Sequence, residues 1–295
     1  LMEIINNISM KIIGIICLVF ALNIGFAQEL EAYRIYDQDG KQIDFGIMSK
    51  SLSKQDVVLF GELHNDPIGH WLQLKLAQSL DIQSELVLGA EWFERDDQLI
   101  IDEYLEGTIS IDHLKKETKV WPNYETDYKP ILEFAQKNEI DFIATNVPRR
   151  YASLVSKKGS AALDSLSVES KGLMPALPFS VTEGDVGYED MKAMMGHGHG
   201  HFNIEDMIAA QALKDYTMAS SIFNNREKGQ LFLHYNGSFH SQKFSGIVGY
   251  LKAAEPKLKI GAISSVSSDS MEWNEEWEGL GTYILVVPEE MTKTH

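Results

Sequence analysis

The sequence predicts an α/β fold with a mostly parallel central sheet flanked by helices. Short apolar runs rich in β-branched residues alternate with helical patterns along most of the chain, and this alternation is typical of an α/β sheet. The predicted strands cover residues 56–60, 85–90, 140–145, 230–235, 258–264 and 282–287. Before them, 32–36 and 41–45 flank an Asp-Gly turn, which predicts a hairpin.

The helices between these strands have recognisable ends. Asp66 and Pro67 precede the apolar pattern of 68–80, and Asp is a good N-cap while Pro fits the first helical turn. Further helices are expected over 130–138, from Asn146-Val147-Pro148 to Gly159, from Asn203 to about Asn225, and over 241–254.

One domain is expected over 52–290, with 28–51 as a hairpin and lead-in. Residues 96–127 and 165–202 do not fit the alternation of strands and helices. Because long connections in a compact domain are often functional, we interpret both as excursions above the C-terminal edge of the sheet, where they form lids.

Residues 10–27 have the pattern of a secretory signal peptide. A basic start at Lys11 is followed by an apolar run over 12–22, and Gly25-Phe26-Ala27 offers a cleavage site before Gln28. An uncleaved anchor is the alternative, although the apolar run is short for a membrane span. The only cysteine, Cys17, follows the bulky Ile16, which disfavours a lipid anchor. We therefore expect a periplasmic or envelope-associated protein.

The net charge of −17 limits the partners that the protein can have. A strongly acidic surface repels nucleic acid and anionic membranes. The sequence therefore predicts no nucleic-acid partner.

Two Gly-x-x-His turns follow predicted strands: Gly61-Glu62-Leu63-His64 and Gly237-Ser238-Phe239-His240. Glu91 ends a third strand. Because ligands bind beyond the carboxyl ends of strands in open α/β sheets, these groups are expected to converge on one pocket. Glu62, His64, Glu91 and His240 are candidate acid-base residues, and His64, Glu91 and His240 are candidate metal ligands.

Glu91 and a third histidine, His234, could each have a purely structural role. Glu91 could instead pair with Arg95 or Arg149 as a purely structural carboxylate. His234 lies within an apolar run, so we interpret it as a hydrogen-bonded core histidine.

A second cluster of potential ligands lies in the excursion over 165–202. Glycine and histidine alternate over 196–201, after two methionines and Tyr188. Histidine-rich tracts bind metals, and His, Met and Tyr are all axial ligands of haem iron. The alternative is a loop with adventitious metal affinity. The candidate cofactor-binding residues are Tyr188, Met195, His197, His199 and His201.

Five motifs in order resemble those of the ChaN-like haem-binding proteins. They extend over roughly residues 52–255, which is most of the mature chain, and comprise 59–67, 88–93 with Asp97-Gln98, 144–150, 210–219 and 236–240. The resemblance implies a mostly parallel α/β fold and haem or iron uptake at the cell envelope. It also implies haem binding, in the best understood case through a tyrosine and as a stacked pair between protomers. The wider superfamily includes Tiki and TraB proteins and erythromycin esterases, some of them hydrolases.

Three functional hypotheses follow. The first is an exported haem-binding protein of iron acquisition, with an outer-membrane haem or iron receptor and a homodimer around haem as its partners. The second is a hydrolase that activates water with the strand-end residues, with or without a divalent metal. The third is a binding module with a vestigial pocket. Haem binding is expected to depend on residues 185–202, and hydrolysis is expected to depend on the residues at the strand ends.

Overall fold

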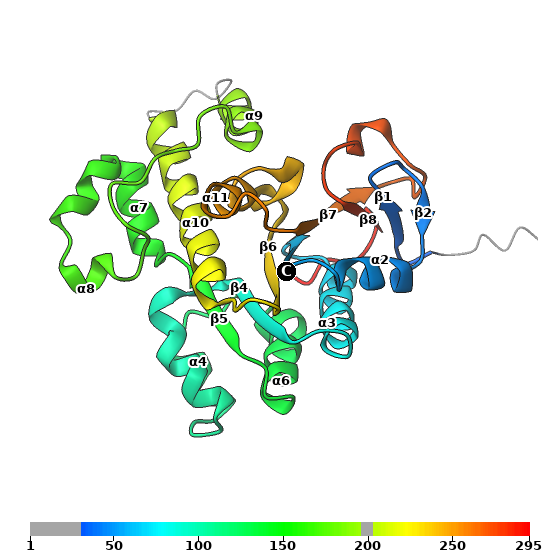
Figure 1. Ribbon diagram of the computed structural model, residues 1–295, viewed down its shortest axis with the longest axis horizontal. Coiled ribbons are helices and arrows are strands. Elements are labelled where there is room, and N and C mark those ends of the chain that lie inside the picture. The colour runs from blue at the N-terminus through cyan, green and yellow to red at the C-terminus, as the bar shows by residue number, and fades with distance from the viewer. Residues whose placement is uncertain (1–30, 196–202) are drawn as a thin grey trace, which may run out of the picture. The chain divides into compact units, whose positions relative to one another are not determined.

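An eight-stranded mixed sheet organises the chain from Tyr33 to His295 (Figure 1). The computed structural model describes residues 31–195 and 203–295. The strand order is β2-β1-β8-β7-β3-β6-β4-β5. The strands are β1 (Arg34–Asp37), β2 (Gln42–Ile43), β3 (Val57–Glu62), β4 (Leu86–Glu94), β5 (Phe142–Asn146), β6 (Leu231–Gly237), β7 (Ile260–Ser268) and β8 (Tyr283–Pro288).

The mostly parallel sheet confirms the predicted fold class. Strands β3 to β8 pair in parallel, whereas the predicted hairpin of β1 and β2 is antiparallel and joins the edge of the same sheet through β8. The helices are α2 (Phe45–Leu52), α3 (Pro67–Asp81), α4 (Gln98–Leu105), α5 (Ile111–Glu117), α6 (Lys129–Lys137), α7 (Arg149–Lys158), α8 (Val168–Lys171), α9 (Val186–Met195), α10 (Ile204–Asn225) and α11 (Ile247–Ala254).

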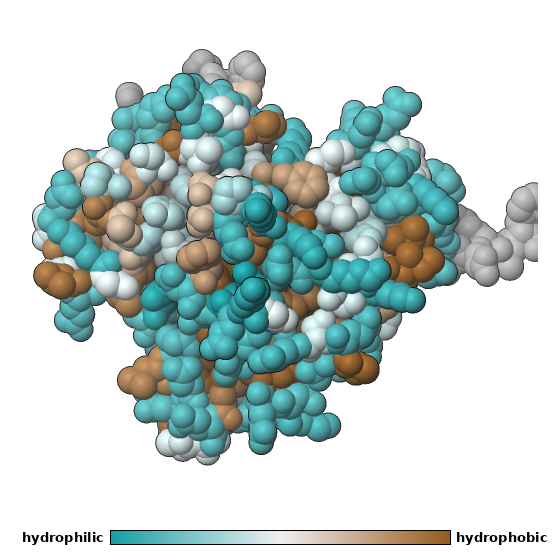
Figure 2. All heavy atoms as spheres, viewed as in Figure 1, coloured by the Kyte–Doolittle hydropathy of each residue, from teal (hydrophilic) through white to brown (hydrophobic). Residues whose placement is uncertain are grey.

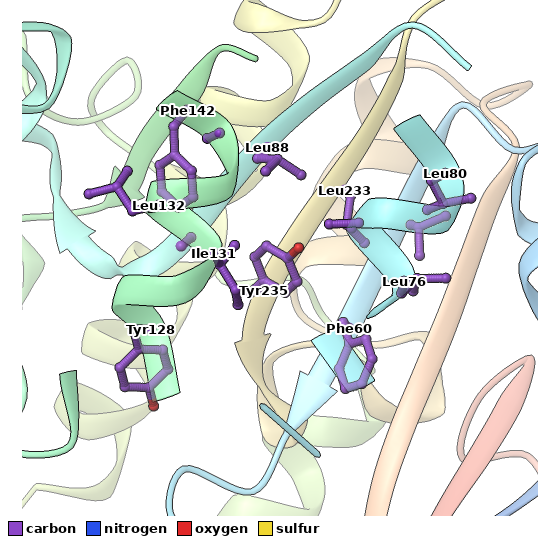
Figure 3. Packing of buried hydrophobic residues seen from close by; sticks show 14 of the residues in the cluster. Phe60, Leu76, Leu80, Leu88, Tyr128, Ile131, Leu132, Phe142, Leu233 and Tyr235 are labelled. Carbon is purple, nitrogen blue, oxygen red and sulfur yellow. The ribbon is translucent and has the colours of Figure 1, made fainter. Parts of the chain in front are cut away.

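The central strands carry apolar side chains on both faces, because helices cover both. On one face Phe60, Leu88 and Tyr235 pack against α3 and α6, as Figure 3 shows. On the other face, alternate residues of the same strands pack against α10 and α11. Burial on both faces explains why these strands are continuous apolar runs in the sequence. The face of the molecule seen in Figure 2 is mostly hydrophilic, with hydrophobic side chains in small patches.

Several predicted helix ends are confirmed by capping contacts. The Asp66 side chain accepts from the Gly69 N–H at the start of α3, and Asn203 accepts from the Glu205 N–H at the start of α10. Gly159 ends α7 with a φ of +78°, which glycine adopts without strain.

Four local predictions differ from the structure. Strand β4 continues to Glu94, so Glu91 lies within the strand and does not end it. Phe45 begins α2 rather than ending a strand. The helix expected over 241–254 begins at Ile247, because Lys243 and Phe244 both have positive φ and interrupt it. Helix α9 forms within the excursion at 165–202, where the sequence has no clear helical period. Within the described ranges, no helix has the length and hydropathy needed to cross a membrane.

Candidate functional site

The two Gly-x-x-His turns lie side by side at the carboxyl edge of the sheet. Strands β3 and β6 are direct neighbours, and their register pairs Glu62 with Gly237. Strand β4 lies on the other side of β6 and brings Glu91 to the same edge. The predicted convergence of Glu62, His64, Glu91 and His240 is therefore observed, since all four line one pocket.

Glu62 is a buried carboxylate that holds His64 in place. Its Oε1 accepts hydrogen bonds from His64 Nδ1 at 2.9 Å and from the Tyr128 hydroxyl at 2.8 Å, and its Oε2 accepts from the Gln73 amide. Burial alone would raise the pKa of Glu62, but the hydrogen bond from His64 and the nearby His70 lower it. Glu62 is therefore ionised at neutral pH.

His64 presents its second ring nitrogen to the pocket. Its side chain is 45% exposed, and no described residue forms a hydrogen bond with Nε2. Burial lowers its pKa, but the hydrogen bond to Glu62 and the negative charges of Glu62 and Glu91 together outweigh this effect, so the pKa is raised. A carboxylate behind Nδ1 fixes the tautomer and increases the basicity of Nε2, which suits either a metal ligand or a general base.

His240 is bonded to carboxylates through both of its ring nitrogens. Its Nε2 contacts Glu91 Oε1 at 3.1 Å, and its Nδ1 contacts Asp215 Oδ1. Glu91 Oε2 in turn accepts the Gly237 N–H at 2.8 Å. The side chains of Glu91, Asp215 and His240 are all buried. Their polar atoms are therefore hydrogen-bonded to other protein groups and not to solvent.

This cluster holds a positive charge on His240. Burial lowers the pKa of His240, but the charges of Glu91 and Asp215 outweigh it and raise the pKa to about 10. The His240 charge also lowers the pKa of Glu91, against the effect of its burial. A doubly protonated imidazole has no free lone pair. His240 therefore cannot serve as a general base at neutral pH.

Gly237 is the point where the two halves of the site meet. A Cβ atom at this position would lie 2.8 Å from His64 Cε1 and Nε2 and 3.6 Å from Glu91 Oε2. The absence of a side chain lets the His64 ring approach the backbone that Glu91 binds.

The pocket has a volume of about 760 Å³ and is lined by both predicted groups of residues. Its floor comprises Glu62, His64, Glu91 and His240, while Tyr188, Met191, Met194 and Met195 of α9 line its wall. The described residues of the two predicted groups therefore line one pocket instead of two separate ones. The fold packs α9 over the strand ends, with the Tyr188 hydroxyl bonded to Asp215.

The comparison with family models identifies the chain. A model described as "Haem-binding uptake, Tiki superfamily, ChaN" matches residues 48–251, more than half of the sequence. The chain belongs to this family. The comparison with curated proteins found no matching sequence.

A solved structure of a ChaN protein has the same fold. The chain is similar to a structure titled "Cofacial heme binding to ChaN of Campylobacter jejuni", with a TM-score of 0.65, 17% identity, and coverage of 86% of this chain and 96% of the other. It is also similar to an erythromycin esterase mutant, with a TM-score of 0.46, 11% identity, and coverage of 80% and 77%. A toxin effector domain from Vibrio vulnificus has a TM-score of 0.44, 16% identity, and coverage of 83% and 41%.

Tyr188, a predicted haem ligand of this ChaN-like chain, has its hydroxyl engaged elsewhere. The hydroxyl donates to Asp215 Oδ2 at 2.7 Å. Burial and the neighbouring carboxylates raise its pKa far above the ordinary value. To bind ferric iron as a phenolate, Tyr188 would have to leave Asp215 and lose its proton. Its contacts are those of a residue that positions Asp215 and, through it, His240.

The predicted metal site is not supported by the geometry. No cluster of three His, Cys, Asp or Glu donors arranged to hold a metal ion occurs in 31–195 or 203–295. His64, Glu91 and His240 do share the pocket, but His240 directs both ring nitrogens at carboxylates instead of the pocket. The predicted cofactor residues His197, His199 and His201 lie outside the described residues.

The structural alternatives have clear outcomes. Glu91 does not pair with either arginine, because Arg149 binds Glu94 and Arg95 binds the Ser221 hydroxyl. His234 is a core histidine as predicted, bonded to Thr145 and Asn236. Burial lowers its pKa to about 4, so it is neutral at physiological pH.

Three important residues were missed at the level of sequence. Asp215 lies in the middle of α10, while Tyr128 and Gln73 bind Glu62 from two other helical segments. Asp215 falls within the motif over 210–219, and a fully buried carboxylate there requires a partner. Nothing in the sequence alone indicates that the partner is His240.

Proposed function

We propose that this protein binds haem in the pocket between α9 and the strand ends, and that it does so as an exported protein of haem or iron acquisition. The observation that supports this most directly is the joint lining of one pocket by methionines and by His64, whose Nε2 is available. Membership of a haem-binding family points the same way.

The residues present suit a haem group. The pocket volume of about 760 Å³ lies within the roughly 300–1,000 Å³ range of small-molecule and cofactor sites. Met191, Met194 and Met195 offer an adaptable apolar wall. Bound haem supplies an iron atom that accepts imidazole, thioether or phenolate ligands. Of the described candidates, His64 has an unoccupied donor atom that is already held in one tautomer.

The proposal also covers where the protein acts and which partners it binds. The signal-like segment over 10–27 supports export to the periplasm or envelope. The related structure from Campylobacter jejuni is titled for cofacial haem binding to that protein. We therefore extend the proposal to a homodimer around haem and to delivery from or to an outer-membrane receptor.

Titration of the purified protein with haemin tests the proposal. We expect saturable binding with a shifted Soret band, and a different Soret position in His64→Ala. His113→Ala is the matched control, because His113 is exposed on α5 and lies outside the pocket lining. A triple His197/His199/His201→Ala variant measures the contribution of the histidine-rich stretch. Absence of any Soret shift in the unmodified protein would falsify the proposal.

A second candidate function is hydrolysis by activated water at the same site. The contact that favours it is Glu62 behind His64 Nδ1, because this arrangement lets Nε2 accept a proton from water. His64 is the base in this scheme, and His240 is not. A panel of ester and peptide substrates tests it: activity should be lost in His64→Ala and reduced in Glu62→Gln. Activity that survives His64→Ala rules out this mechanism.

A further inference from the structure

One lysine lines the pocket without a carboxylate partner. Lys214 lies on α10, is half-buried, and forms no ion pair with any described residue. Two other lysines near the same wall are paired: Lys192 of α9 binds Glu205, and Lys243 binds Asp190. In an acidic chain with a net charge of −17, an unpaired and partly desolvated ammonium group facing a pocket is unusual.

The remaining charges of the pocket are balanced or negative. Glu62 and Glu91 are ionised on the floor, because the pKa of each is lowered. The His240 charge is shared between Glu91 and Asp215. Lys214 is therefore the one lysine or arginine that the described part of the pocket offers to an anion.

Lys214 belongs to the α10 side of the pocket. It is three residues after Gln211, which also lines the pocket and lies 3.1 Å from His240 Nδ1. Residues three apart lie on one face of a helix. An anionic group is thus repelled by the Glu62 and Glu91 carboxylates and attracted toward α10.

The part of the pocket that α9 lines is largely apolar. Met191, Met194 and Met195 come from α9, and Phe239, which is 59% exposed, projects from the second Gly-x-x-His turn. A ligand that satisfies both surfaces has an apolar body and an acidic group at one edge.

We propose that Lys214 binds a carboxylate of the ligand, so that the pocket selects amphiphilic anions and holds haem with a propionate toward α10. This inference rests on the proposed haem-binding function and adds the ligand class and orientation. The charge-assisted hydrogen bond between an ammonium and a carboxylate is among the stronger polar contacts, and partial burial limits its screening by salt.

Binding of haemin and of haemin dimethyl ester, compared in the same detergent buffer, tests this inference. The ester keeps the ring and iron but lacks the carboxylates. We expect the unmodified protein to prefer haemin, and Lys214→Ala to weaken haemin binding by roughly tenfold, which corresponds to one charged contact. Ester binding should not change in Lys214→Ala. Lys214→Arg should retain most of the preference, because it keeps the positive charge.

Lys192→Ala is the control, since Lys192 is exposed and already paired with Glu205. It should bind both ligands as the unmodified protein does. If Lys214→Ala weakens both ligands equally, or neither, the carboxylate contact is absent and the inference fails while haem binding stands. If the unmodified protein binds neither ligand, the proposed function itself fails and the inference falls with it.

Discussion

The two Gly-x-x-His turns have the same spacing and adjacent positions, yet their histidines differ in almost every physical property. His64 is half-exposed, is bonded through Nδ1 only, and directs Nε2 to the pocket. His240 is buried, contacts carboxylates through both nitrogens, and has a pKa raised to about 10. One turn presents an accessible ring nitrogen to the pocket, and the other holds a buried charge.

The difference comes from the partners that the fold provides. The first turn faces one carboxylate, Glu62, whose other hydrogen bonds come from neutral groups of Tyr128 and Gln73. The second turn is enclosed between Glu91 of β4 and Asp215 of α10. An identical motif can therefore leave one histidine accessible from the pocket and enclose the other between carboxylates.

Removal of each histidine should separate these roles most strongly. His240→Ala leaves Glu91 and Asp215 buried without a counter-charge, which we expect to reduce the free energy of unfolding by about 3–5 kcal/mol. His64→Ala leaves Glu62 with two other donors and should cost only about 1 kcal/mol, while altering the Soret band of the haemin complex. Urea unfolding and haemin titration measure both. Equal stability losses would contradict the comparison.

The pH dependence of stability should show the His240 charge directly. The pKa of His240 is raised from 6.5 to about 10, so its contribution is complete below pH 6.5 and is lost as the pH rises toward 10. Glu91 has a lowered pKa, so its contribution is present above pH 4.5 and is lost as the pH falls. Unfolding measured between pH 6 and 9.5 should therefore show declining stability, and His240→Gln should flatten this decline. An unchanged slope in His240→Gln would show that His240 is not charged.

The glycines that begin the two turns, Gly61 and Gly237, offer a matched pair of substitutions. In Gly61→Ala the new Cβ lies 2.8 Å from the backbone oxygen of Ile263, which cannot move easily, so we expect a loss of about 1–3 kcal/mol. In Gly237→Ala it meets the half-exposed His64 ring, which can turn toward solvent. Gly237→Ala should thus retain most of its stability but bind haemin as His64→Ala does. Haemin binding unchanged in Gly237→Ala would show that the position of the His64 ring does not matter.

Tyr188→Phe should have the smallest effect on haemin binding, and it tests the role of the second turn. It removes the hydroxyl that Asp215 Oδ2 accepts from, at a cost of about 1–2 kcal/mol. The Soret and charge-transfer bands of the haemin complex should stay as in the unmodified protein. A changed spectrum would instead support the original hypothesis that Tyr188 binds the iron.

Sequence reasoning reached the fold and much of the site, because both depend on local patterns. Continuous apolar runs predicted the buried strands. The two glycine turns predicted Glu62, His64 and His240, and the end of a third apolar run predicted Glu91. It did not predict α9, because a helix that packs only part of one face, around Tyr188, has a weak periodic signal.

The sequence by itself determined the strand-helix order, the family motifs and the residue types at the strand ends. Only the tertiary structure decided which histidine is free, because Asp215, Tyr128 and Gln73 reach the site from distant helical segments. The charge of a buried group depends on the net effect of desolvation and its nearest partners. Those partners are set by packing across the sheet edge, and the spacing of Gly and His does not encode them.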